Sequence, residues 1–213
     1  KALSGDQLIS YVLPFERQSS EIRAFASSCG GPSEVMAGIR TEFETLATAG
    51  TLALGTLPKG TPKSGVGGPL DSFGLGKDKG NGLFRYRFLP KGHKGSVREG
   101  IQYTAEEKNS PTANHHFQRC LDIINVQRNN HADVSDLSCS FLCGELSPYK
   151  IYLVRPPPGV VLPLSSSGEE QFSLLLGNCY GLPEAPQILY RNIHEFMLSQ
   201  GFRRSNYCYG TYI

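Results

Sequence analysis

The sequence contains no tryptophan, so the commonest aromatic platform is missing. It has no window of about 18 uninterrupted apolar residues, which excludes a helix that crosses a membrane. A strong excess of one charge is missing too: 21 basic and 19 acidic side chains give a net charge of +2. That balance excludes a globally basic sheath for nucleic acid but leaves room for a local basic patch. With 213 residues, 39% of them hydrophobic, the chain can bury a core as one large domain or two small ones.

The six cysteines are scattered and do not predict a disulfide framework, because a chain of this length is not a small disulfide scaffold. Only Cys139 and Cys143 are close together, and such a pair without a second pair is a weak metal signal. We therefore expect no bound metal in the isolated chain and reduced thiols. Reduced thiols favour an intracellular, reducing compartment or the interior of an organelle. The chain begins at Lys1 rather than Met, which fits removal of a targeting segment as well as a sequence that simply starts there.

Signatures of several enzyme classes are also missing. No nucleophile elbow occurs, and Gly74-x-Gly76 lacks the Gly-Lys-Ser pattern of a phosphate-binding loop. His115 and His116 are adjacent, so their side chains point to different faces of a helix and make poor joint ligands. We expect both of them at the surface, and we expect His194 to face solvent.

Apolar spacing predicts three helices and several strands. After a run of helix breakers at 29–32, apolar side chains recur at steps of three and four from residue 33 onward, and Gly50 is a suitable stop. Further helices are predicted from Pro111 to Asn129 and from Pro183 to Gly201. Their expected apolar stripes are Phe117, Cys120, Leu121 and Ile124, and Leu189, Ile193, Phe196 and Met197. Strands are predicted at 83–89, 132–140, 150–154 and 171–176, which together with the helices indicates a mixed α/β or α+β domain.

Residues 58–98 differ in composition from the rest of the chain. They contain ten glycines, nine basic and two acidic residues, a local charge of +7. This pattern is typical of a phosphate-facing arm that binds nucleic acid, or of a solvated glycine-rich loop, and composition alone leaves both open. The basic residues assigned to the arm are Lys77, Lys79, Arg85, Arg87, Lys91 and Lys94.

A series of short segments follows in order along the chain. They read Leu-Pro-Lys-Gly at 57–60, Pro-Lys-Gly-His at 90–93, Glu-Gly-Ile-Gln-Tyr-Thr at 99–104, Ser-Pro-Thr at 110–112, Asp-Leu-Ser-Cys-Ser-Phe-Leu-Cys-Gly-Glu-Leu at 136–146, Pro-Pro-Gly at 157–159, Tyr-Gly-Leu-Pro-Glu-Ala-Pro at 180–186 and Leu-Ser-Gln-Gly-Phe-Arg-Arg-Ser at 198–205. Each is weak alone, but their order and spacing make chance a poor explanation. Together they resemble the reverse transcriptase of copia-type LTR retrotransposons, from about residue 33 to the last residue.

The resemblance implies a fingers-and-palm architecture: an α+β fold with a mixed or antiparallel sheet and two to three packed helices. It also implies phosphoryl transfer by two Mg²⁺ ions that carboxylates from two palm segments hold. By this resemblance, Asp136 matches the first metal-binding aspartate, and Phe141 matches an aromatic residue near the nucleotide sugar. Glu184, Ala185 and Pro186 match the remnants of the nucleotide pocket.

This chain departs from the family where the chemistry lies. The family's Tyr-Val-Asp-Asp hairpin is expected shortly after Ile213, and no Asp-Asp pair occurs within the sequence. The arginine that grips the triphosphate has no clear counterpart near Arg87, and the family's Lys-Gln pair is Pro183-Glu184 here. The glycine-rich stretch 65–76 replaces a strand of the family. We therefore expect a framework that keeps its packing positions and has lost its catalytic residues.

These patterns predict an N-terminal extension at 1–32, a fingers-like region at 33–110 and a truncated palm-like region at 111–213. The first functional expectation is a catalytically inactive, reverse-transcriptase-derived domain that serves as a structural or accessory subunit of a larger assembly, with other protein subunits as partners and no cofactor. The second is an RNA-directed DNA polymerase that requires Mg²⁺ and belongs to a longer polyprotein. The third is a non-catalytic module that binds nucleic acid through the basic arm.

Overall fold

The computed structural model describes residues 1–62, 68–92, 110, 115–131, 136–137, 139–146, 150–208 and 210–213. Within these residues the chain forms five α-helices and two antiparallel sheets, one of three strands and one of two. The expected α+β class and antiparallel sheet are confirmed, whereas the expected number of two to three helices was too low. Among the described residues, no helix is both long and apolar enough to cross a membrane.

The first 31 residues form short helices that contribute to the core. Helix α1 (Gly5–Ser10) begins with a capping box from Ser4 and packs on α3, and α2 (Ser20–Ala24) begins with a cap from Ser19. Two 3₁₀ turns, η1 (Phe15–Arg17) and η2 (Phe25–Ser27), flank α2. Sequence periodicity missed these elements because each is shorter than two turns. The buried side chains of this segment include Leu3, Leu8, Ile22 and Cys29.

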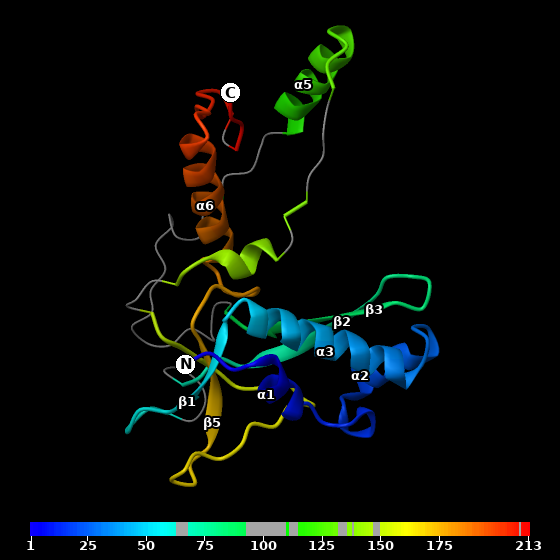
Figure 1. Cartoon of the computed structure of the whole chain (residues 1–213), viewed down its shortest axis with the longest axis vertical. Coiled ribbons are helices and arrows are strands. Elements are labelled where there is room, and N and C mark those ends of the chain that lie inside the picture. The colour runs from blue at the N-terminus through cyan, green and yellow to red at the C-terminus, as the bar shows by residue number, and fades with distance from the viewer. Residues whose placement is uncertain are drawn as a thin grey trace.

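Helix α3 (Pro32–Thr48) lies at the centre of the fold and matches the predicted helix closely. It begins after Gly31 with a proline in its first turn, and it ends before Gly50, whose φ of 65° is left-handed. The predicted apolar face is buried, at Val35, Ile39, Phe43 and Leu46. Figure 1 shows α3 between α1 and the β2–β3 hairpin.

The three-stranded sheet has the order β1–β5–β4. Strand β5 (Gln171–Leu175) is central, and β4 (Tyr152–Val154) and β1 (Leu52–Thr56) pair with it on opposite sides. Strands β4 and β5 confirm the predictions at 150–154 and 171–176. Strand β1 was not predicted, because its sequence Leu-Ala-Leu-Gly-Thr does not alternate between apolar and polar residues.

The second sheet is a hairpin of β2 (Ser72–Asp78) and β3 (Phe84–Pro90). Strand β3 confirms the prediction at 83–89 and turns Phe84, Tyr86 and Phe88 into the core. The glycine-rich stretch was expected to replace a strand of the family, but its last part lies within β2. A Cβ at Gly74 would overlap the ring of Tyr86, so the glycine is what lets β2 pass over that ring.

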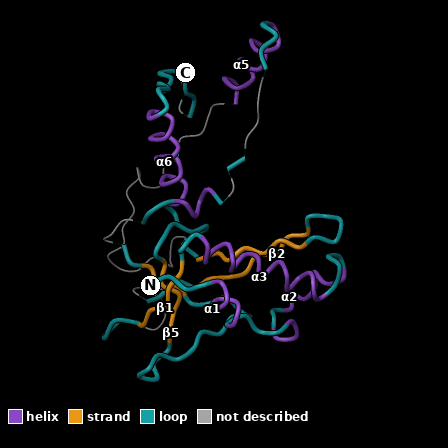
Figure 2. The backbone as a smooth tube through the Cα atoms, viewed as in Figure 1, coloured by secondary structure: helices purple, strands orange, loops and turns teal. Residues whose placement is uncertain are grey.

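The C-terminal half contains α5 (His115–Gln127), the 3₁₀ turn η3 (Ser140–Cys143) and α6 (Ala185–Ser199). Figures 1 and 2 show α5 and α6 at one end of the molecule, away from both sheets. The expected strand at 132–140 was wrong in its described part: residues 136–137 and 139 are not in a strand, and η3 follows. Residues 132–135 and 138 lie outside the described residues, as do residues 111–114, where the second helix was expected to begin.

An apolar stripe was predicted on each of the last two helices, and the stripe of the last helix was predicted to be core; the structure buries neither stripe. Helix α5 buries none of its described side chains, and Ile124 is exposed. Helix α6 buries Ala185 and Ile188 instead of the predicted stripe, and Phe196 is 61% exposed. Periodicity finds an apolar face, but it does not show whether the chain itself supplies something to cover that face.

Candidate functional site

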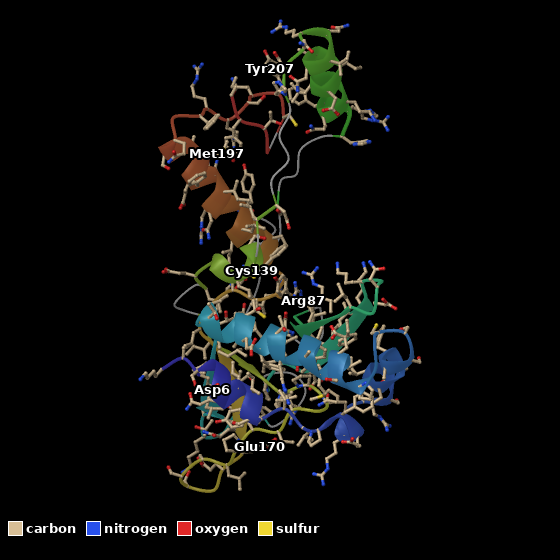
Figure 3. The ribbon with its side chains drawn as sticks, turned by 45° about the vertical axis from the view of Figure 1, so that its right-hand side comes forward. Asp6, Arg87, Cys139, Glu170, Met197 and Tyr207 are labelled. Atoms are coloured by element: carbon tan, nitrogen blue, oxygen red, sulfur yellow. The ribbon has the colours of Figure 1, made fainter. Side chains whose placement is uncertain are left out.

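A cavity of about 460 Å³ brings together several residues that the sequence singled out. Its lining residues are Arg85, Arg87, Asp136, Leu137, Cys139, Ser140, Phe141 and Tyr180. Strand β3 supplies the two arginines, and the loop after β5 supplies Tyr180. The residues from Asp136 to Phe141 come from η3 and the segment before it. Figure 3 shows Arg87 and Cys139 near each other at this junction. The predicted residues Asp136, Phe141, Arg85 and Arg87 therefore share one cavity.

Arg87 is held from two sides. Its Nη1 donates to Oε2 of Glu42, a carboxylate on α3 whose side chain is 1% exposed. On the other side the guanidinium lies over the ring of Tyr180, with Cζ 5.2 Å from the ring centroid. The Tyr180 ring in turn lies 5.5 Å from that of Phe141. Arg87 thus joins α3 to the aromatic wall of the cavity.

Glu42 is the most deeply buried carboxylate near the cavity. Its Oε1 accepts the backbone N–H of Phe88 at 3.1 Å, so both of its oxygens bond to β3. Burial raises the pKa of Glu42, while Arg87 and the hydrogen bonds act in the opposite direction. Sequence reasoning missed Glu42, although a signal was present: a glutamate three residues after Ile39 and four before Leu46 falls on the buried face of a helix.

The outer face of the β2–β3 hairpin carries most of the predicted basic arm. Register places Lys77 opposite Arg85 and Leu75 opposite Arg87, and these side chains alternate with the buried ones of β3. Lys91 Nζ lies 5.8 Å from the ring centroid of Phe73, which is 38% exposed. Lys79 lies just beyond β2 and is exposed, and Lys94 lies outside the described residues.

Asp136 is exposed and, among the described residues, is the one carboxylate in the lining of this cavity. In the described part of the chain, no three side chains of His, Cys, Asp or Glu form a group that could hold a metal ion. The lining instead combines Asp136 with the two cationic side chains of Arg85 and Arg87, and cations repel divalent metal ions. The residues present therefore do not fit a two-Mg²⁺ centre.

Glu184 and its neighbours lie outside this cavity. Glu184 precedes α6, is 4% exposed, and accepts hydrogen bonds from Lys150 Nζ at 2.8 Å and Tyr152 Oη at 2.9 Å. Ala185 is buried, and Pro186 lies in the first turn of α6, where a missing N–H costs nothing. Glu184, which the resemblance matched to the nucleotide pocket, is thus a buried partner of Lys150 and of Tyr152 on β4.

The described cysteines and histidines form no catalytic pair. Cys29, Cys120 and Cys179 are free thiols. Burial raises the pKa of Cys179 to about 12, which makes it a poor nucleophile. His115 and His116 are exposed, as expected. His194 does not simply face solvent: its Nδ1 lies 2.9 Å from Tyr212 Oη, and its ring stacks on Tyr190.

The chain was compared with protein families, with curated proteins and with solved structures. No family model matches it. No curated protein matches its sequence, and no solved structure matches its fold.

Proposed function

We propose that this chain is a catalytically inactive domain, derived from a copia-type reverse transcriptase, that serves as a structural or accessory subunit of a larger protein assembly. The proposal depends on the ordered motifs for the origin of the domain and on the cavity for its lack of activity. The single observation that carries the lack of activity is the Glu42–Arg87 pair, because it neutralises the more enclosed of the two cavity cations.

An active nucleotide site needs cations that are free to face a triphosphate. Arg87 already has a buried anion, Glu42, as its partner. A phosphate group that approached Arg87 would therefore also come close to the Glu42 carboxylate, which repels it. Separating the pair would leave Glu42 buried and charged without its cation, which is costly. Arg87 is therefore better suited to hold α3 against β3 than to bind and release nucleotides.

The carboxylates argue in the same direction. Asp136 is one exposed carboxylate beside two arginines, whereas two-metal transfer needs several carboxylates around the ions. We expect Asp136 to act as a surface residue that neither binds Mg²⁺ tightly nor supports catalysis.

Primer extension on a poly(rA)–oligo(dT) template, with Mg²⁺ and separately with Mn²⁺, tests the lack of activity. We expect no incorporation above the level of the Asp136→Asn variant. Robust incorporation by the native chain that disappears in Asp136→Asn would contradict the proposal and establish the polymerase alternative. The accessory role predicts, in addition, that the native chain migrates in a complex larger than its own mass.

A second candidate function is favoured by the outer face of the hairpin. Lys77 lies opposite Arg85 on this face, and Lys91 Nζ lies 5.8 Å from the centroid of the exposed Phe73 ring. Cations interleaved with an aromatic ring are typical of surfaces that bind single-stranded nucleic acid. This module would bind RNA without catalysis.

Fluorescence anisotropy with labelled oligo(rU) tests this candidate. Binding should fall steeply between about 50 mM and 200 mM salt. Lys77→Glu combined with Arg85→Glu should weaken it about tenfold or more, while Arg40→Glu, which reverses an exposed cation on α3, should not. Absence of binding at the lower salt concentration would remove the candidate.

A further inference from the structure

The free edge of β1 ends beside an acidic cavity. We propose that this edge binds an extended basic peptide, which adds a strand to β1 and places a lysine or arginine next to Glu169. The inference rests on the proposed accessory role, because it names the kind of partner that such a subunit would hold.

The pairing register shows which backbone groups of β1 are free. Thr51 C=O accepts from Leu176 N–H, so residues 51, 53 and 55 direct their backbone groups toward β5. Residues 52, 54 and 56 direct theirs away from it, and Leu52 C=O accepts from Leu3 N–H. Leu54 and Thr56 have no backbone partner among the described residues. Two successive outward positions are therefore available to a new strand.

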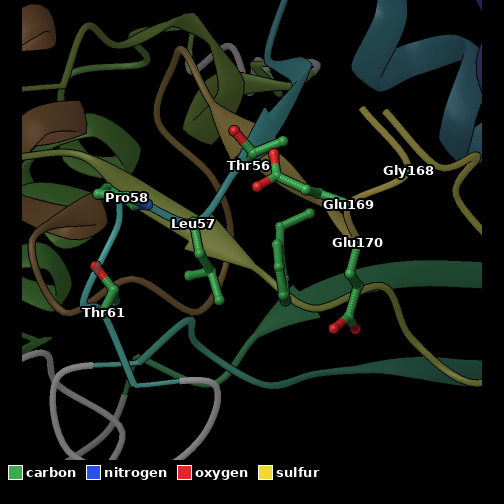
Figure 4. A pocket seen from close by; sticks show the side chains of 8 residues that line it. Thr56, Leu57, Pro58, Thr61, Gly168, Glu169 and Glu170 are labelled. Carbon is green, nitrogen blue, oxygen red and sulfur yellow. The ribbon is translucent and has the colours of Figure 1, made fainter. Parts of the chain in front are cut away.

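A cavity of about 340 Å³ begins where this edge ends (Figure 4). Its lining residues are Thr56, Leu57, Pro58, Thr61, Gly168, Glu169, Glu170 and Phe172. Among the described residues, this set contains two carboxylates and no cation, together with the apolar surface of Leu57 and Pro58. Such a lining suits a lysine or arginine side chain, whose methylene groups pack on apolar surface while its charge meets a carboxylate.

The two glutamates differ in whether a cationic side chain neutralises them. Glu170 pairs with Arg155 at 3.3 Å. Glu169 has no cationic partner within the described chain; its Oε2 accepts from Ser167 Oγ at 3.1 Å. Figure 4 shows Glu169 turned toward Thr56 and Glu170 turned away from it. The uncompensated charge therefore lies on the side of the cavity nearest the free edge, which selects a basic partner over an acidic one.

The β1 edge also offers a variant that separates strand addition from folding. Proline at position 56 removes an N–H that points away from β5, so the β1–β5 pairing keeps all its hydrogen bonds. Thr56→Val is the matched control, because it changes the side chain and keeps the N–H. For the carboxylate, Glu169→Gln keeps the acceptor for Ser167 and removes the charge, and Glu16→Gln changes an exposed glutamate on η1.

The experiment measures binding to the full chain at low salt by fluorescence anisotropy. The probe is a fluorescein-labelled peptide of about eight residues that alternates valine and threonine and carries a lysine at each end, so that a cation reaches Glu169 in either strand direction. The comparison peptide carries glutamates at both ends. A third peptide, N-methylated on alternate amides, blocks strand addition without any change to the protein.

We expect the lysine peptide to bind about tenfold more tightly than the glutamate peptide. Thr56→Pro should weaken its binding about fivefold and Glu169→Gln about threefold, while both control variants bind normally. If Thr56→Pro fails to fold, the N-methylated peptide provides the same test and should bind at least fivefold more weakly than its parent.

Several results would overturn the inference. They are no binding at about 1 mM peptide, equal binding of both peptides, or binding that neither Thr56→Pro nor N-methylation changes. A dimer in peptide-free sedimentation that Thr56→Pro dissociates would show that a second copy occupies the edge instead. These outcomes are independent of primer extension, so the peptide site and the lack of catalytic activity can fail separately.

Discussion

The carboxylate of Glu42 on α3 accepts a hydrogen bond from the guanidinium of Arg87 on β3, a residue 45 positions later in the sequence. The pair joins the central helix to the hairpin; Arg87 lines the cavity that holds Asp136, and Glu42 lines a neighbouring cavity between α3 and β3. Its partners are unequally exposed, with 1% of the Glu42 side chain and 24% of the Arg87 side chain accessible. Loss of the buried partner should therefore cost the fold more than loss of the accessible one.

Replacement of Glu42 by alanine should lower the free energy of unfolding by about 2–3 kcal/mol, because it leaves the Phe88 N–H and the Arg87 guanidinium without their acceptor. Urea unfolding followed by circular dichroism measures the change. Glu44→Ala, an exposed glutamate on the same helix, should change stability by less than about 0.5 kcal/mol. Equal effects of the two substitutions would show that the pair contributes nothing beyond helix propensity.

The stability of the fold should depend on the titration of Glu42. Burial raises its pKa above the usual 4.5, so the folded state binds the proton more tightly than the unfolded state does. The stability that this group contributes is complete below pH 4.5 and is lost as pH rises through the folded-state pKa. The unfolding free energy of the native chain minus that of Glu42→Gln should therefore fall as pH rises in urea titrations, because glutamine does not titrate. A native-minus-variant value that rises with pH would mean that Arg87 outweighs burial.

Local pattern was enough to predict α3, β3, β4 and β5, because each has a clear apolar period or a short apolar run bounded by turn residues. It was not enough for β1, whose five residues do not alternate, or for β2, in which glycines replace the alternating side chains. In β2 the glycines are required by the large rings on the neighbouring strand. The need for a small residue there becomes visible only when the pairing is known.

The candidate site was predicted in its members but not in its connections. The sequence singled out Asp136, Phe141, Arg85 and Arg87, and the structure places them around one cavity. The sequence could not show that Arg87 pairs with Glu42, since no local pattern links residues that far apart. For the same reason Glu184 was interpreted as an anion beside a phosphate site, although its partners lie 34 and 32 residues earlier.

The surroundings of Glu184 give a prediction that tests whether this carboxylate stabilises the fold or is only a surface charge. Tyr152 is 2% exposed and its hydroxyl donates to Glu184 at 2.9 Å, so Tyr152→Phe leaves a buried carboxylate with one donor fewer. We expect a loss of about 1.5 kcal/mol in unfolding free energy. Tyr207→Phe is the matched control, because that ring is 93% exposed. Unchanged stability in Tyr152→Phe would show that Lys150 alone satisfies Glu184.

The glycine at position 74 gives the sharpest test of how the hairpin packs. A Cβ there would overlap the hydroxyl end of Tyr86, a ring that is 2% exposed and has little room to move. Gly74→Ala should therefore cost about 2–3 kcal/mol of unfolding free energy. Gly5→Ala is the control: it lies in the first turn of α1, and its Cβ would meet only Glu44 Cγ at 3.9 Å.

In that control, alanine should leave stability unchanged or raise it by up to about 0.5 kcal/mol, because alanine loses less backbone entropy than glycine in a helix. Thermal and urea unfolding of both variants measure the contrast. If Gly74→Ala proved as harmless as Gly5→Ala, Tyr86 would have to lie elsewhere, and with it the packing of β3 on α3. Arg87 follows Tyr86 on β3, so its place beside Glu42 would then be wrong as well, and Glu42 would not neutralise it.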